Sequence, residues 1–113
     1  MRFDLDAIAP DIVYKLLVAT VVPRPIAWVT TQSAAGVLNA APYSFFNVMG
    51  PSPPTLVLGL MAHAQGGFKD TARNIVETGQ FVVNLVPEAL APAMNVTAVD
   101  APGGVNELDL AGL

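Results

Sequence analysis

Apolar and polar positions in the first third of the chain change from a helical spacing to a strand-like one. In residues 8–19 the apolar side chains recur at helical intervals, and Pro10 and Asp11 suit a first helical turn, so a short helix is predicted. In residues 21–31 the side chains alternate with a period of two, most regularly from Ile26 onward, which indicates a strand.

Turn residues after this strand predict a hairpin. The cluster Gln32–Gly36 ends in a glycine, which accepts the positive φ that tight turns use. Residues 37–41 then resume an extended apolar pattern and form the second strand of the hairpin. After an aromatic stretch, the proline-rich segment Gly50–Pro54 acts as a rigid break.

The rest of the chain predicts shorter elements. They are a buried strand at residues 55–61, a loop at 62–68, a helix at 70–77, a strand at 81–86, a short helix that opens at Pro87 with Glu88 in its first turn, and a loop at 96–104. We expect Asp70 to cap the first of these helices and Gly79 to end it.

Together these elements predict a mainly β domain with short helices over residues 1–113. Four strands do not close a barrel, and residues 105–113 stop without a helix cap or a charged tail. Because an open apolar sheet edge is an aggregation hazard, we expect the chain to be the N-terminal portion of a larger domain.

Composition indicates that part of the surface is covered by other protein. Hydrophobic residues make up 53% of the 113 residues and charged residues only 12%. A chain this short has room for one domain with a modest core. Oligomerisation, or a missing remainder of the domain, is therefore expected to cover apolar surface.

Charge and residue usage exclude several functions. The net charge of −4, with no basic run, argues against nucleic-acid binding. The lack of cysteine excludes disulfides, thiolate metal sites and cysteine nucleophiles, and one histidine, His63, cannot build a histidine-rich metal site. The N-terminus reads as neither a signal peptide nor a membrane span, so a cytoplasmic protein is expected.

The most specific chemistry lies in residues 39–47, where aromatic side chains alternate with hydroxyl and amide groups. Such a segment can stack against a flat heteroaromatic ring and hydrogen-bond to its edge, and this favours a flavin. The alternative is that Phe45 and Phe46 are ordinary core residues and Ser44 caps a turn.

A second candidate is the start of the helix at Asp70. Helix N-termini bind phosphate through unpaired N–H groups and the helix dipole, and Lys69, Thr71 and Asn74 add donors there. The alternative is a helix capped by Asp70, with Lys69 and Arg73 on a solvated surface. No group is placed to orient His63 in a catalytic triad, so no catalytic residue is assigned.

Taken together, these segments resemble the flavin reductase-like family of FMN-binding split-barrel proteins, which includes flavoredoxin. The resemblance is carried by Pro23–Thr31, Gly36, Asn39, Ala41–Asn47, Pro53–Pro54, Lys69–Thr71, Asn74–Ile75 and Phe81–Asn84. It implies a Greek-key-like split β-barrel, incomplete in this chain because family domains continue past Leu113, and a homodimer with FMN near the subunit interface.

The resemblance also implies the binding residues. The residues implied to bind the isoalloxazine and ribityl groups are Asn39, Ala41, Pro42, Tyr43, Ser44, Phe45 and Asn47. Those implied to bind the cofactor tail and phosphate are Thr30, Thr31, Lys69 and Thr71.

The implied activity is that of an NAD(P)H-dependent flavin reductase. Hydride would pass from NADH or NADPH to FMN, and electrons onward to a partner monooxygenase or another acceptor. The flavin supplies the redox chemistry in such proteins, so a conspicuous protein acid or base is not needed. Two alternatives stay open: a flavoredoxin-like electron carrier without direct nicotinamide use, and a non-enzymatic flavin-binding or scaffold module.

Overall fold

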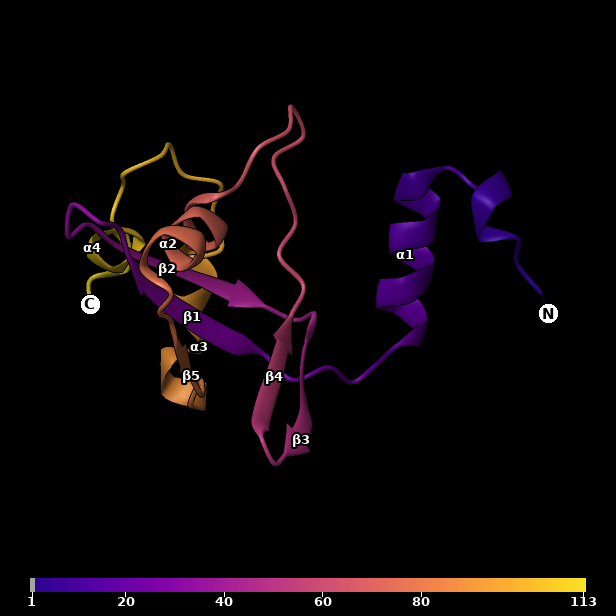
Figure 1. Ribbon diagram of the computed structural model, residues 1–113, viewed down its shortest axis with the longest axis horizontal. Coiled ribbons are helices and arrows are strands. Elements are labelled where there is room, and N and C mark those ends of the chain that lie inside the picture. Colours follow the sequence, from indigo (N-terminus) through magenta and orange to yellow (C-terminus); the bar gives the residue numbers. More distant parts are fainter. Residues whose placement is uncertain (1) are drawn as a thin grey trace.

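A computed structural model describes residues 2–113 as a three-stranded sheet, a separate two-stranded hairpin and a helix that stands apart from both (Figure 1). In chain order the elements are η1 (Leu5–Ala7), α1 (Pro10–Thr20), β1 (Ala27–Gln32), β2 (Leu38–Tyr43), β3 (Phe46–Pro51), β4 (Pro54–Leu58), α2 (Asp70–Thr78), β5 (Val82–Asn84), η2 (Glu88–Leu90), α3 (Ala91–Val96) and α4 (Glu107–Ala111).

The three-stranded sheet is antiparallel in the order β2-β1-β5, with β1 at its centre. Val29 of β1 lies opposite Ala41 of β2 on one side and Val83 of β5 on the other. Because β2 is an edge strand, it tolerates Pro42, which has no N–H to pair with a further strand.

Helices cover both faces of β1. Thr31 accepts a hydrogen bond from Asn74 of α2, whereas the Trp28 indole donates to Thr97, just after α3. Side chains of odd and even positions in a strand point to opposite faces, so α2 and α3 lie on opposite sides of the sheet. The buried apolar core between them is small and consists of Ala27, Trp28, Val29, Ala40 and Ala72.

The hairpin of β3 and β4 was only half predicted. The predicted break at Gly50–Pro54 contains the turn of this hairpin. The residues before it were not predicted as a strand, but they form β3, which pairs antiparallel with β4 from Phe46 and Leu58 onward. The described residues therefore contain five strands in two open sheets rather than four. The expectation of a mainly β fold that does not close into a barrel is confirmed.

Most other predicted elements are present, with shifted ends. The first helix and the short helix after Pro87 are confirmed. The first strand begins only at Ala27, not at Val21, because Pro23 and Pro25 have no N–H for the sheet. The other predicted strands, 55–61 and 81–86, shorten to β4 and β5.

Two helix ends differ from the prediction. The N-cap of α2 is Lys69, and Asp70 is the first helical residue, although Gly79 does end the helix with a φ of 69°. The last residues are not without a cap: α4 forms there, and the Asn106 side chain accepts a hydrogen bond from the N–H of Leu108.

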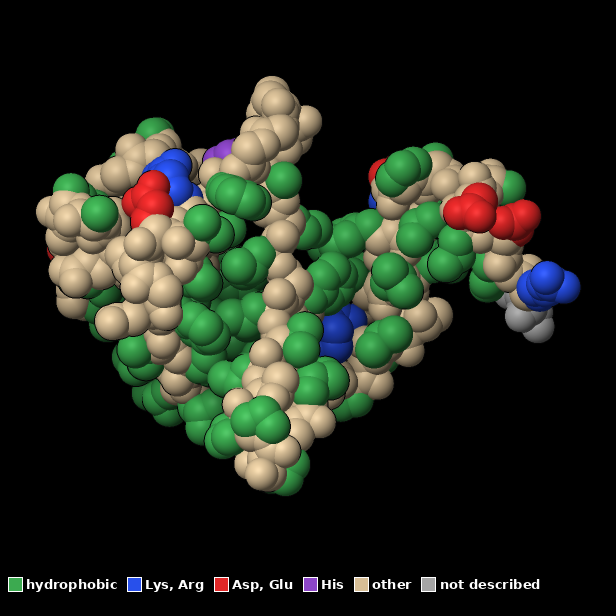
Figure 2. All heavy atoms as spheres, viewed as in Figure 1, with side chains coloured by type: hydrophobic (Ala, Val, Ile, Leu, Met, Phe, Trp, Pro, Cys, Tyr) green, Lys and Arg blue, Asp and Glu red, His purple; other side chains and the backbone are tan. Residues whose placement is uncertain are grey.

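The molecule is more extended than a closed domain of the same length. Its radius of gyration is 15.5 Å, against about 13 Å expected for 113 residues. Figure 2 shows hydrophobic side chains over the face between the sheet, the hairpin and α1, where the surface is hollowed. Large apolar side chains on the hairpin and α1 are exposed, among them Val48, Leu56 and Leu17.

Candidate functional site

A pocket of about 290 Å³ opens along β2, and we call it the β2 pocket. Its walls come from β2 and the residues after it, the segment between β4 and α2, the start of α2, and the segment between α3 and α4. Of the predicted binding residues, those that line it are Asn39, Ala41, Pro42, Tyr43, Ser44, Phe45, Lys69 and Thr71.

The pleat of β2 aligns three of these residues. Asn39, Ala41 and Tyr43 alternate along the strand and so share the face on which α2 lies. The Asn39 side-chain amide donates to the Thr71 hydroxyl at 2.8 Å, and both residues are buried. This bond joins the two segments that the sequence singled out separately.

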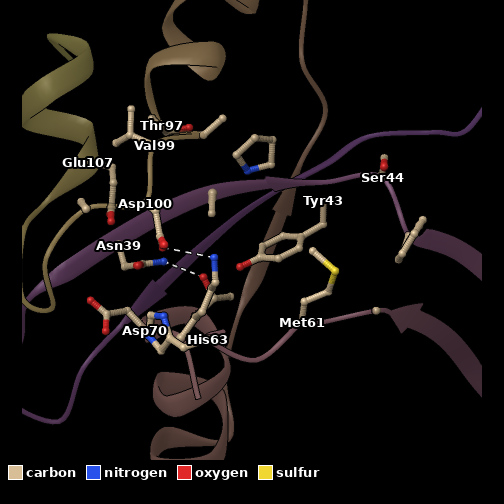
Figure 3. A pocket seen from close by; sticks show the side chains of 18 of the residues that line it. Asn39, Tyr43, Ser44, Met61, His63, Asp70, Thr97, Val99, Asp100 and Glu107 are labelled. Carbon is tan, nitrogen blue, oxygen red and sulfur yellow. Dashed lines mark hydrogen bonds and ion pairs between the residues drawn. The ribbon is translucent and has the colours of Figure 1, made fainter. Parts of the chain in front are cut away.

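Tyr43 projects into the β2 pocket with its hydroxyl toward the side chains of Asn39 and Asp100 (Figure 3). Burial raises the pKa of the Tyr43 phenol above its ordinary value. A hydrogen bond with the Thr71 side chain lowers this pKa, and the nearby carboxylates of Glu107 and Asp70 raise it further. The phenol therefore stays neutral at physiological pH and can both donate and accept hydrogen bonds.

Aromatic and apolar groups form the other end of the pocket. The rings of Tyr14 and Phe45 lie 6.1 Å apart at 60°, and Met61 lies beside Tyr43 (Figure 3). Gly59 passes so close to Phe45 that its N–H donates to the Phe45 carbonyl at 2.7 Å.

Arg24 holds α1 beside this end of the pocket. Its guanidinium donates to the carbonyls of Val18 and Val21, at the C-terminal end of α1, at 2.8 and 2.6 Å. It also donates to the Ser44 hydroxyl at 3.3 Å and lies 5.9 Å from the centre of the Phe45 ring. Arg24 is thus engaged with the end of a helix, where a cation is favoured by the dipole.

The first residues of α2 line the pocket, and the N-terminus of the helix has no side-chain cap. Asp70 does not compete for these N–H groups. One of its oxygens pairs with Arg73, and the other accepts from the N–H of Gly104 at 3.1 Å. The Lys69 ammonium lies beside the helix start and pairs with Asp100 at 3.1 Å.

Three predicted residues lie outside the β2 pocket. Thr30 and Thr31 accept hydrogen bonds from Asn84 and Asn74, respectively, and line a separate hollow with the end of α2. Asn47 is exposed on β3. The two threonines are neighbours in β1, so their side chains face opposite sides of the sheet. Thr31 lies opposite Asn39 on the α2 face, but its hydroxyl is bonded to Asn74 and does not line the β2 pocket.

Several lining residues were not predicted. They are Tyr14, Gly59, Met61, His63, Asp70, Thr97, Ala98, Val99, Asp100, Ala101, Gly103 and Glu107. Most belong to loops that fold back over β2 and carry no periodic pattern. Glu107 was detectable in principle, because an acidic residue directly after Asn106 is typical of a first helical turn. It is 6% exposed, and one of its oxygens accepts from the N–H of Ala40 at 3.1 Å.

Two further properties concern residues 2–113 as a whole. They contain no group of three acidic or histidine side chains arranged to hold a metal ion. No helix in this range has the length and apolar character needed to cross a membrane.

Known proteins are similar to this chain in sequence and fold. A family described as "Flavin reductase like domain" matches residues 19–113. A protein of Aquifex aeolicus (strain VF5) is 43% identical over all of this chain and 58% of its own length.

Two solved structures are similar as well. They are nitrilotriacetate monooxygenase component B from Bacillus cereus, with a TM-score of 0.91, and the 2-nitrobenzoate 2-nitroreductase NbaA of Pseudomonas fluorescens, with 0.84. Both are 38% identical over 99% of this chain, which covers 55% and 52% of them. The chain thus spans about half the length of the proteins it matches. It belongs to the flavin reductase-like family, and its open sheets are part of that family's split-barrel fold.

Proposed function

We propose that this chain binds FMN noncovalently in the β2 pocket and acts as an NAD(P)H-dependent flavin reductase. The observation that carries the proposal is the junction of two segments. The aromatic and polar residues of β2 meet the start of α2 through the Asn39–Thr71 hydrogen bond, in one pocket.

The chemistry of the pocket suits the parts of FMN. Tyr43, Phe45 and Met61 offer flat or polarisable apolar surface for a ring system. The uncapped start of α2 and the Lys69 ammonium suit a phosphate. The volume of about 290 Å³ is close to the lower limit for small-molecule sites.

Bound FMN would supply two-electron redox chemistry by accepting hydride from a nicotinamide. The residues of this chain would bind and orient it: the neutral Tyr43 phenol as a hydrogen-bond partner, Asn39 and Thr71 as polar groups, and the β2 backbone as the support. No side chain needs to gain or lose a proton for these roles.

The named neighbours support a redox function of this kind. One is a component of a monooxygenase and the other is a nitroreductase. We propose that electrons pass from this protein to a partner monooxygenase or a comparable acceptor. We further propose that it works as a homodimer, which would cover the exposed apolar side chains of α1 and the hairpin, and that it acts in the cytoplasm.

The test is to titrate the purified protein with FMN and follow the quenching of flavin fluorescence. Saturable binding is expected, and its absence would contradict the proposal. NADH and NADPH are then added to the flavin-loaded protein, and their oxidation is followed at about 340 nm. Oxidation supports the reductase. Binding without oxidation, but with reduction by a partner protein, indicates a flavoredoxin-like carrier instead.

A further inference from the structure

We propose that Asp100 determines specificity for the charged tail of the flavin, by competing with the ligand's phosphate for Lys69. The Asp100 carboxylate pairs with the ammonium that the phosphate of FMN would otherwise bind. Riboflavin lacks this phosphate, so Asp100 reduces the preference of the pocket for FMN over riboflavin. This inference rests on the proposed flavin binding.

The contact that suggests it is the ion pair between the Lys69 ammonium and an Asp100 oxygen at 3.1 Å. Both residues line the β2 pocket, and Figure 3 shows the Asp100 side chain directed into it. Of the lysines and arginines in residues 2–113, Lys69 is the one that lines this pocket. The cation best placed for a phosphate is therefore already paired.

The other two carboxylates of the pocket are engaged elsewhere. Asp70 pairs with Arg73 and accepts from the N–H of Gly104. Glu107 accepts from the N–H of Ala40. Among the interactions of the described residues, Asp100 has Lys69 as its side-chain partner and no second anchor. It is the carboxylate that can move without leaving another group unpaired.

Exposure shows that the phosphate can win this competition. The Asp100 side chain is 70% exposed and that of Lys69 is 37% exposed. Ion pairs this exposed change an equilibrium by only about two- to fivefold. A phosphate monoester carries about −1.5 to −2 charges near pH 7 against −1 for a carboxylate, so it binds Lys69 more strongly. Asp100 therefore reduces the affinity for FMN without preventing binding.

Riboflavin provides the matched ligand, because it shares the ring and the ribityl chain with FMN. A residue that acts on the phosphate changes the affinity for FMN alone. A residue that shapes the ring site changes the affinity for both ligands. The ratio of the two dissociation constants therefore separates these roles.

The experiment measures both dissociation constants by fluorescence quenching at low ionic strength. Asp100→Asn is expected to tighten FMN binding about two- to fivefold and to leave riboflavin binding unchanged. Asp109→Asn, which removes the same charge from an exposed position on α4, should change neither. Lys69→Gln should weaken FMN binding alone, and Asp100→Asn should lose most of its effect in that background.

Two outcomes overturn the inference and differ in what they imply. If FMN binds but Asp100→Asn leaves the ratio of the two constants unchanged, the inference is wrong and the proposed function stands. If neither ligand binds the wild type or any variant, the proposed function is wrong and the inference falls with it.

Discussion

Tyr43 is the residue at which burial and charge act together in the β2 pocket. Burial of its phenol, with Glu107 and Asp70 nearby, disfavours the phenolate and raises the pKa of Tyr43 above the ordinary value. In the unfolded chain the same group ionises near pH 10. Above that pH the unfolded state loses a proton that the folded state keeps, so the free energy of unfolding falls as pH rises.

This gives a prediction for alkaline pH. Wild-type protein should lose stability between about pH 10 and the raised pKa of Tyr43, whereas Tyr43→Phe should lose less over the same window. The measurement is urea unfolding at pH 8 and above pH 10, followed by the fluorescence of the single tryptophan, Trp28. Tyr14→Phe is the control for removing a tyrosine hydroxyl, because Tyr14 lies at the other end of the pocket and is 45% exposed. Equal behaviour of the two variants would contradict the prediction.

Gly59 is a second residue whose identity the pocket requires. A Cβ added there would lie 2.7 Å from the Cβ of Phe45, which is closer than packed carbon atoms approach. Phe45 would have to shift, at a cost of about 1–3 kcal/mol for overpacking. Gly59→Ala is therefore expected to lower the urea midpoint and to weaken FMN binding.

The matched control for Gly59→Ala is Gly50→Ala on the neighbouring hairpin. There the nearest heavy atom to an added Cβ is the Pro53 carbonyl oxygen at 3.9 Å, an ordinary contact. This variant should keep both its stability and its FMN affinity. Losses of the same size in both variants would show that the close approach to Phe45 does not matter.

At the scale of elements, one side chain connects the last helix to the sheet. Glu107 begins α4 and accepts from the N–H of Ala40 on the free edge of β2. Ala40 is fully buried, so this N–H has no access to water when its acceptor is removed. Leaving a buried donor unpaired costs about 1–3 kcal/mol.

Glu107→Ala should therefore lower the free energy of unfolding by about 1–3 kcal/mol, and Glu107→Gln, which keeps a carbonyl acceptor, should lose less. Urea unfolding of both variants at neutral pH measures the difference. If Gln and Ala cost the same, the bond to Ala40 does not hold α4 in place, and the stability must come from apolar packing of the helix.

The sequence predicted those elements whose residues carry their own local signals. α1 follows from its apolar spacing. Gly79 ends α2 because the residue there has a left-handed backbone conformation, which glycine adopts most easily. β3 was missed because its exposed residues do not alternate and its partner β4 lies across a proline turn. α4 was missed because it has only five residues and because its Glu107 side chain bonds to Ala40, which only folding brings near. The Asn106 cap is local and was overlooked.

As with the secondary structure, only part of the lining of the β2 pocket was predicted. Residues of β2 and of the start of α2 have chemistry that stands out in the sequence, and the structure brings them together. The loop at residues 96–104 was predicted, but its contribution to the pocket was not, since that depends on the loop folding back over β2. Thr30 and Thr31 have suitable hydroxyls, but strand geometry turns them to other partners.

At the scale of the whole molecule, the β sheets have free edges and exposed apolar side chains. β5 pairs only with β1 among the described strands, and Leu85 beside it is 82% exposed. On the hairpin, Val48 of β3 lies opposite Leu56 of β4, and the two are 61% and 45% exposed. Exposed apolar side chains that lie side by side, as Val48 and Leu56 do, are typical of an interaction surface.

We therefore predict that the chain associates with a second copy through the hairpin, in a concentration-dependent way that light scattering after size exclusion will detect. Val48→Lys places a charge in this patch and should shift the mass toward the monomer, because burying an unpaired ammonium is costly. The control is Val76→Lys, which makes the same change on the outer face of α2, where Val76 is 70% exposed. A monomeric wild type at all concentrations, or equal dissociation by both variants, would show that the hairpin is not the surface of association.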